Sequence, residues 1–120
     1  MEESAKRFRD LRVWQKGVDL VKEIYTITKS FPSDELYGLT SQMRRAAVSI
    51  PSNIAEGFRR KGAKEFKQFL TIALGSCSEL ETQTVIAHEL GYIDHEQDKN
   101  ISLLIDHVCG MIVNLRKRVL

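Results

Sequence analysis

Lysine and arginine side chains offer the most evident chemistry in this chain of 120 residues, because they gather in three short stretches. The stretches hold Lys6, Arg7, Arg9 and Arg12; then Arg59, Arg60, Lys61 and Lys64; and finally Arg116, Lys117 and Arg118. Cationic side chains bind phosphate groups, and the counterions released in the process favour binding. The chain as a whole has a formal charge of only +2. A fold that brings the three stretches together would therefore create a site for a polyanion such as nucleic acid.

The residues that usually carry catalysis or metal binding lack the spacing that those functions need. No glutamate lies three residues before His88, His95 or His107, as the di-iron sites of helical bundles require. The sequence also has no His-Glu-x-x-His motif, no Gly-x-Ser-x-Gly motif and no phosphate-binding glycine-rich loop. Glu79 and Glu81 are two residues apart, so on a helix their carboxylates diverge. We expect no catalytic residue, metal or cofactor, and interpret the histidines as partly exposed surface residues.

Two cysteines and the absence of long apolar stretches indicate where the protein resides. Cys77 and Cys109 are too few to form a disulfide framework in a chain of this length. No stretch has the apolar length of a signal peptide core or a membrane span. We expect a cytoplasmic protein that does not enter the membrane. Both cysteines lie on apolar stripes and at the same level of the fold described next, so they could be neighbours in its core, but we expect no disulfide between them.

Apolar residues recur at spacings of three and four in four segments, about residues 11–30, 37–57, 64–90 and 94–115. This period is typical of amphipathic helices, and no segment shows the alternation of a strand. Asp94 is placed to cap the fourth helix with Gln97, and Gly91 to end the third. The pattern predicts an all-α protein, an up-down-up-down four-helix bundle that forms a single domain over residues 1–120. Residues 1–9 are expected to be disordered or loosely held.

Such a topology would place both chain ends and the second loop at one end of the bundle. Eleven cations would then face five carboxylates there, a formal charge of +6, while the opposite end would carry −4. Helix dipoles account for acids at the starts and bases at the ends of the second and fourth helices. They do not account for Arg12 or Lys64, which lie near helix starts. Two interpretations stay open, a polyanion site and a merely solvated basic end.

The segment RRAAVSIPSNIAEG, residues 44–57, places a proline inside the second helix. Pro51 has no backbone N–H to donate and its ring crowds the carbonyl of Ala47, so we expect a bend there. The small residues around it would allow another backbone to approach closely. Asn53 points at least partly inward at the level of Trp14, whose indole N–H needs an acceptor if it is buried. The sequence therefore predicts structural roles for Trp14, Pro51 and Asn53.

Three long segments resemble a known family. FPSDELYGLTSQMRRAAVSIPSNIAEG, EFKQFLTIALGSCSELETQ and LGYI are similar to the bacterial four-helix-bundle proteins encoded in intervening sequences of 23S rRNA genes. The resemblance covers about residues 11–115. It implies a four-helix bundle that assembles into a homopentameric ring. It also implies a relation to the accessory variability determinant of diversity-generating retroelements, which associates with a reverse transcriptase and binds nucleic acid.

In such a ring, the second helix could contribute to both the bundle and a subunit contact, with Ala47, Ser49 and Ser52 as candidates for close approach. Arg44 and Arg45 could line the ring or pair with Glu79 and Glu81. The expected nucleic-acid-binding residues are Arg12, Arg44, Arg45, Arg59, Arg60, Lys61, Lys64, Arg116, Lys117 and Arg118.

Two functions from different classes follow. The first is a non-enzymatic protein that binds structured RNA or an RNA–DNA hybrid through backbone charge. Because no aromatic platform for single strands is visible in the sequence, little base specificity is expected. The alternative is a protein–protein scaffold that docks an enzyme such as a reverse transcriptase.

Overall fold

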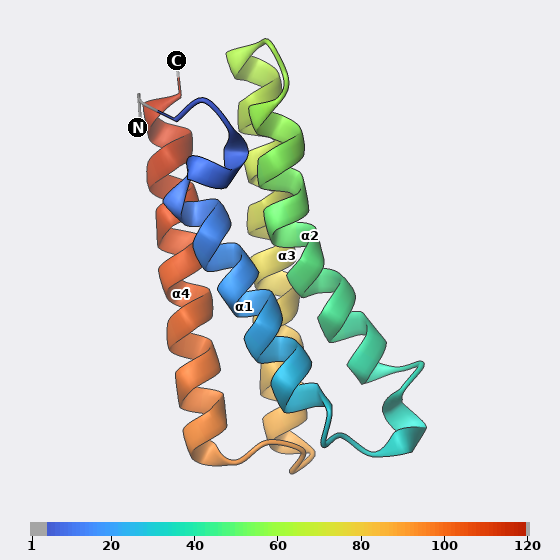
Figure 1. The fold of residues 1–120 in the computed structure, drawn as a ribbon. Coiled ribbons are helices and arrows are strands. Elements are labelled where there is room, and N and C mark those ends of the chain that lie inside the picture. The colour runs from blue at the N-terminus through green and yellow to red at the C-terminus, as the bar shows by residue number, and fades with distance from the viewer. Residues whose placement is uncertain (1–4, 120) are drawn as a thin grey trace.

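The computed structural model describes residues 5–119, and within them it contains four long helices, two short 3-10 turns and no strand. The helices are α1 (Arg12–Thr28), α2 (Leu39–Phe58), α3 (Ala63–Glu89) and α4 (His95–Arg118), and the 3-10 turns are η1 (Phe8–Asp10) and η2 (Ser33–Glu35). Successive helices run in opposite directions, each packs against the next along the chain, and α1 closes the bundle against α4 (Figure 1). The predicted all-α, up-down-up-down four-helix bundle is confirmed.

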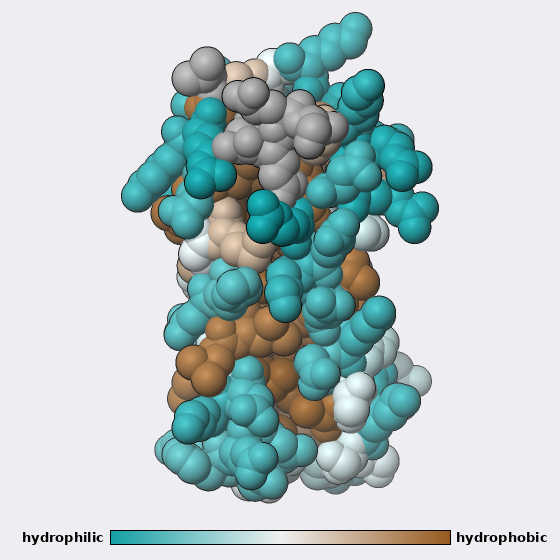
Figure 2. All heavy atoms as spheres, turned by 60° about the vertical axis from the view of Figure 1, so that its left-hand side comes forward, coloured by the Kyte–Doolittle hydropathy of each residue, from teal (hydrophilic) through white to brown (hydrophobic). Residues whose placement is uncertain are grey.

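Each helix contributes large aliphatic side chains to one continuous core. The residues among them that are almost completely buried are Leu20, Ile24, Met43, Ile50, Ile54, Leu70, Leu80, Ile105, Val108 and Ile112. Burial of one such side chain stabilises a fold by about 1.5–3 kcal/mol before the entropy of ordering is subtracted. Hydrophilic side chains crowd both ends of the bundle, and apolar surface is exposed between them (Figure 2). None of the helices in the described residues is long and apolar enough to cross a lipid bilayer.

Two glycines set the distance of α2 from its neighbours. A Cβ on Gly17 of α1 would lie 3.4 Å from the Cβ of Pro51, so the proline ring packs directly on the backbone of α1. A Cβ on Gly57 would lie 2.6 Å from the Cβ of Phe69 on α3, which is closer than side chains tolerate. The predicted close approach around Pro51 is therefore present. Pro51 is buried inside a helix that continues on both sides of it, and the bend expected there stays a prediction.

Asn53 bonds within α2 rather than across to Trp14. Its Nδ2 donates to the carbonyl oxygen of Ser49 at 2.7 Å and to Ser49 Oγ at 2.9 Å. Ser49 Oγ in turn lies 2.8 Å from Oγ of Ser76 on α3. Within residues 5–119 no hydrogen bond joins the Trp14 indole to Asn53, and the donors of Asn53 are used one turn back on its own helix. Asn53 instead completes a polar link between α2 and α3.

Capping interactions between residues close together in the sequence define the turn between α3 and α4. Asp94 Oδ1 accepts the N–H of Gln97 at 2.7 Å, and Gln97 Oε1 accepts the N–H of Asp94 at 2.9 Å, which confirms the predicted capping box. Gly91 has a φ of 79°. The N–H groups of Gly91 and Tyr92 donate to the carbonyls of His88 and Ala87, the pattern of a Schellman motif.

The N-terminal segment is more ordered than its polar composition suggests. Residues 1–4 lie outside the described part of the chain, whereas Phe8 packs on Trp14 with ring centroids 5.3 Å apart. Gln15 Nε2 donates to the carbonyl of Arg9 at 2.8 Å, which fixes the same segment. Residues 5–9 are thus held against the bundle. The expectation of a loose segment over residues 1–9 stays a prediction for residues 1–4, which lie outside the described residues.

Cys77 of α3 and Cys109 of α4 lie close enough for one to influence the titration of the other. Cys77 is buried, Cys109 is half-buried and both are free thiols. Burial, with smaller contributions from the nearby Cys109 and Glu81, raises the pKa of Cys77 to about 12. Cys77 is therefore a protonated, unreactive core residue at neutral pH.

Replacement of Gly57 by alanine should destabilise the bundle, because the new methyl group would force α2 and α3 apart. Overpacking of this kind costs about 1–3 kcal/mol. Gly110 is the matched control, since no atom lies within 4 Å of a Cβ placed there. Gly110→Ala should raise stability by about 0.5–1 kcal/mol through helix propensity alone. Thermal unfolding followed by circular dichroism distinguishes the two, and an unchanged melting temperature for Gly57→Ala would contradict the close packing.

Candidate nucleic-acid interface

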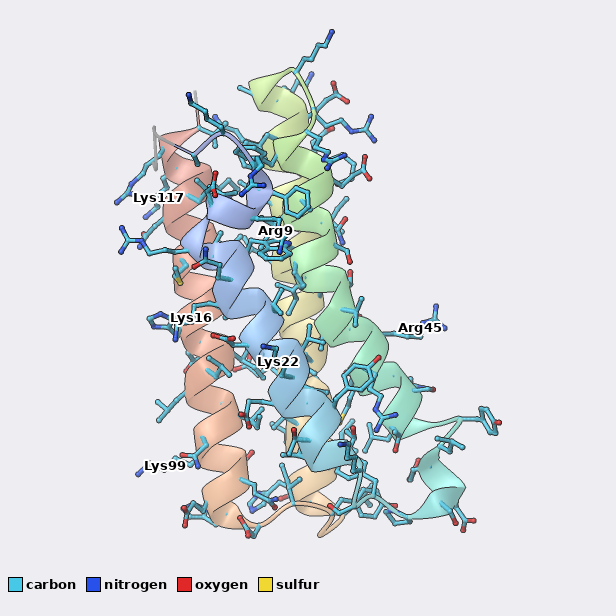
Figure 3. The ribbon with its side chains drawn as sticks, viewed as in Figure 1. Arg9, Lys16, Lys22, Arg45, Lys99 and Lys117 are labelled. Atoms are coloured by element: carbon cyan, nitrogen blue, oxygen red, sulfur yellow. The ribbon has the colours of Figure 1, made fainter. Side chains whose placement is uncertain are left out.

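The three basic stretches meet at the end of the bundle that carries both chain ends and the α2–α3 turn (Figure 1). Arg9 and Lys117, from the first and third stretches, both lie at this end, which we call the basic end (Figure 3). Its cations are Lys6, Arg7, Arg9, Arg12, Arg59, Arg60, Lys61, Lys64, Arg116, Lys117 and Arg118. Among the described residues, only Asp10, Glu56 and Glu65 oppose them there. The stretches therefore gather as predicted.

Aromatic rings and short contacts hold several of these arginines in place. The guanidinium of Arg59 lies 5.2 Å from the ring centroid of Phe8, and that of Arg60 lies 5.1 Å from the ring centroid of Phe69. Arg60 also pairs with Glu56, with 2.9 Å between Nη2 and Oε2. Arg116 Nη1 donates to Oγ1 of Thr71 at 3.2 Å. These contacts reduce the side-chain entropy that phosphate binding would otherwise have to remove.

The lysines of the same surface are differently placed. Lys61, Lys64 and Lys117 are exposed, and within residues 5–119 they form no ion pair or hydrogen bond. Lys64 lies in the first turn of α3, where the helix dipole disfavours a cation. An external anion would therefore interact with these ammonium groups without first breaking an internal contact.

Arg44 and Arg45 do not belong to the basic end. Arg44 Nε donates to Oγ1 of Thr28 at 2.9 Å, and its guanidinium lies 4.6 Å from the ring centroid of Tyr25. Both partners are on α1, so Arg44 links α1 to α2, and the ligand-binding role expected for it stays a prediction. Arg44 pairs with neither Glu79 nor Glu81, because the α1 partners lie on the other side of α2.

Arg45 and the small residues of α2 have separate surroundings. Arg45 extends away from the bundle (Figure 3) and lines a shallow depression of about 350 Å³ together with Glu79 of α3. Ala47 has no exposed surface, so it is part of the core and not available for the subunit contact considered above. Ser49 is half-buried and bonded to Ser76, whereas Ser52 is exposed.

A carboxylate joins the two loops at the opposite, acidic end. Glu35 Oε1 accepts the N–H of Leu39 at 3.0 Å, and Glu35 Oε2 accepts the hydroxyl of Tyr92 at 2.8 Å. The ring of Tyr92 packs on Phe31 with centroids 5.3 Å apart. Hydrogen bonds from Leu39 and Tyr92 lower the pKa of Glu35, and the bond to Glu35 raises the pKa of Tyr92. Sequence reasoning counted Glu35 only as a charge and missed this contact, which spans 57 residues of the chain.

The histidines show little that could act chemically. His88 Nδ1 lies 3.9 Å from Asp98 Oδ2, and the rings of His88 and His95 are 6.1 Å apart. Over residues 5–119, no three His, Cys, Asp or Glu side chains are arranged to hold a metal ion.

Comparison with known proteins places this bundle in a family. The family model described as 23S rRNA-intervening sequence protein matches residues 9–114. The chain belongs to this family.

A solved structure supports the fold. It is a protein of unknown function from the S23 ribosomal protein family of Bacteroides thetaiotaomicron, determined at 1.70 Å. The two chains share 22% sequence identity over 88% of this chain and 98% of the other, with a TM-score of 0.79. At this identity the likeness shows the helical bundle alone. The comparison with curated proteins finds no match.

Segments on which the family resemblance rests meet in the fold at the acidic end. Phe31 and Glu35 come from the first of them, and Tyr92 from the LGYI segment. The contact among these residues fixes the α1–α2 connection against the α3–α4 turn. In this member of the family it is a structural feature of the acidic end, remote from the basic residues.

Loss of the hydroxyl in Tyr92→Phe should lower the melting temperature more at pH 7 than at pH 3. The pKa of Glu35 is below its ordinary value of 4.5, so its stabilising effect is complete above that value and is lost as the pH falls through the lowered pKa. Stability of the parent should also fall above pH 10, because the raised pKa of Tyr92 opposes ionisation in the folded state. Melting curves from acid to alkaline pH test both effects.

Tyr37→Phe serves as the control, since Tyr37 is 93% exposed. It should melt like the parent at every pH. A Tyr92→Phe penalty of equal size at pH 3 and pH 7 would contradict a role for the ionised carboxylate.

Proposed function

We propose that this intervening-sequence family member is a non-enzymatic cytoplasmic protein that binds RNA through its basic end. The observation that carries the proposal is the meeting of three separate chain segments, with eleven cations, on one end of the bundle. Phosphate contacts supply most of the affinity in sequence-independent binding and weaken steeply with salt. Exposed lysines, and arginines that pack on aromatic rings, lie on one surface and can bind phosphate groups independently of sequence.

Self-association would increase this charge. We propose that the protein forms the homopentamer that its family resemblance implies. Ile72 and Ile86 of α3 and Leu90, which caps its C-terminus, support the proposal, because they are 51%, 43% and 54% exposed and their spacing places them on one side of the helix. Large aliphatic side chains exposed in a line are typical of an interaction surface. Cyclic symmetry would place every basic end on the same face of the ring.

Charge reversal at the basic end should abolish RNA binding without unfolding the protein. The variant Lys61→Glu, Lys64→Glu, Lys117→Glu changes exposed lysines that form no internal contact within residues 5–119. We expect the parent to bind RNA at low salt with a steep salt dependence, and the variant to lose both properties. Fluorescence anisotropy over a salt series measures this.

The control variant Lys22→Glu, Lys29→Glu, Lys99→Glu changes the net charge by the same amount away from the basic end. If both variants lose affinity equally, net charge and not the basic end determines binding. Absence of binding by the parent at low salt would refute the proposed function.

Substitution of Ile72 and Ile86 by lysine should reduce the assembly to smaller species, because two desolvated aliphatic contacts would become buried charges. Light scattering coupled to gel filtration gives the mass, and Leu103→Lys on α4, also exposed, is the control. A parent that is monomeric refutes the assembly. If the variant has the same mass as the oligomeric parent, Ile72 and Ile86 lie outside the subunit contact. These residues would then be available to bind another protein, which is the alternative scaffold function.

A further inference from the structure

The basic end contains a pocket with aromatic walls that the sequence did not reveal. A depression of about 410 Å³ lies between the N-terminal segment and the end of α2, lined by Lys6, Arg7, Phe8, Arg9, Phe58 and Arg59. Its size is within the range of pockets that hold small organic ligands. Sequence reasoning found no aromatic platform for nucleic acid, because Phe8 and Phe58 are 50 residues apart in the chain and meet only through the fold.

The rings and one arginine form a layered arrangement beside this pocket. Trp14 packs on Phe8 with a 58° tilt, and the guanidinium of Arg59 lies over the Phe8 ring. Phe58 contributes a second ring, which is fixed edge-on against Phe66 at 6.0 Å. Arg59 is exposed and lines the pocket together with Phe8 and Phe58. Nucleobases stack on aromatic rings and on guanidinium planes of this kind.

The cations around the rings are held by the fold of the N-terminal segment. Asp10 Oδ2 accepts the N–H groups of Lys6 and Arg7 at 3.4 Å and 3.3 Å. Asp10 Oδ1 also lies 3.8 Å from Nη2 of Arg7, so this arginine is partly neutralised. Lys6 and Arg9 are exposed and line the same pocket. Their charges can therefore reach a phosphate group next to a base held by Arg59.

We propose that this pocket binds an unpaired nucleotide, with its base stacked on the Arg59–Phe8 layer and its phosphate near Lys6 and Arg9. The proposal rests on the proposed function and deepens it. A base within a duplex has both faces covered by its neighbours, whereas a single strand or a bulge can present one base to the pocket. The protein should therefore prefer single-stranded over double-stranded RNA at equal phosphate number.

Trp14 provides a direct readout, because it is the one tryptophan of the chain and touches Phe8. The probes are oligo(A) RNA of about twenty nucleotides, an oligo(A)–oligo(U) duplex of about ten base pairs with the same number of phosphates, the DNA counterpart of the single strand, and AMP. Oligo(A) should bind more tightly than the duplex and change the emission of Trp14, while the duplex should bind without changing it. A response to the DNA strand shows that the base and not the ribose is recognised, and a response to AMP shows that a free nucleotide suffices.

Phe8→Leu and Arg59→Lys test the stacking layer in two ways. Each should weaken oligo(A) binding at least about fivefold and weaken duplex binding by a clearly smaller factor, since stacking supplies the difference. Arg59→Lys keeps the charge while it removes the planar guanidinium and its fixed donors, so it applies even if Phe8→Leu disturbs folding. Tyr25→Leu is the matched control, because it removes a ring under a different guanidinium, that of Arg44, away from the basic end.

The outcomes separate the pocket from the basic end as a whole. If the parent binds single strands and duplex equally and the emission of Trp14 does not change, the pocket proposal is wrong while RNA binding by the basic end stands. The same conclusion follows if Arg59→Lys binds oligo(A) as the parent does. If the parent binds neither RNA at low salt, the proposed function itself fails.

Discussion

The structure depends on one constraint, that every helix must bury an apolar stripe against two neighbours while its connections stay short. Leu20, Ile50, Leu70 and Ile105, one from each helix, are almost completely buried in the shared core. Short connections make successive helices antiparallel, which brings residues far apart in the sequence to the same end. The gathering of three basic stretches is a consequence of this packing and needs no direct contact among them. The separation of positive and negative charge along the molecule therefore results from the burial of apolar side chains between the helices.

Within that frame, α2 is the helix whose position is most tightly specified. A proline inside a helix removes one backbone hydrogen bond and costs about 3 kcal/mol or more. Pro51 nevertheless contributes a compact apolar surface that fits against Gly17, while Gly57 brings the other end of α2 against Phe69. Between these points, Asn53, Ser49 and Ser76 join α2 to α3 by hydrogen bonds. Small residues therefore fix the distance of α2 from α1 and α3 and its register against them. Larger apolar side chains would allow more than one such arrangement.

Features that depend on neighbours in the sequence could be predicted, and features that depend on distant residues could not. The α2 and α3 helices begin and end within two residues of their expected limits, and Gly91 and Asp94 cap as local rules require. The bonds of Arg44 to Thr28 and of Tyr92 to Glu35 join different helices or loops, and neither leaves a periodic signal. The gathering of the basic stretches at one end could be predicted because it follows from topology, whereas the partners of Arg44 depend on a single side-chain rotamer and could not be predicted.

The separation of charge along the bundle also affects how the molecule moves before any contact forms. The described part of the chain is 43 Å long, with cations in excess at one end and carboxylates at the other, so it is a large electric dipole. In the field of a polyanion such a molecule rotates until its positive end leads, which raises the fraction of collisions that are productive. The acidic end then faces away and repels a second strand. The electric field of the polyanion would thus orient the protein in solution before any side chain touches the polyanion.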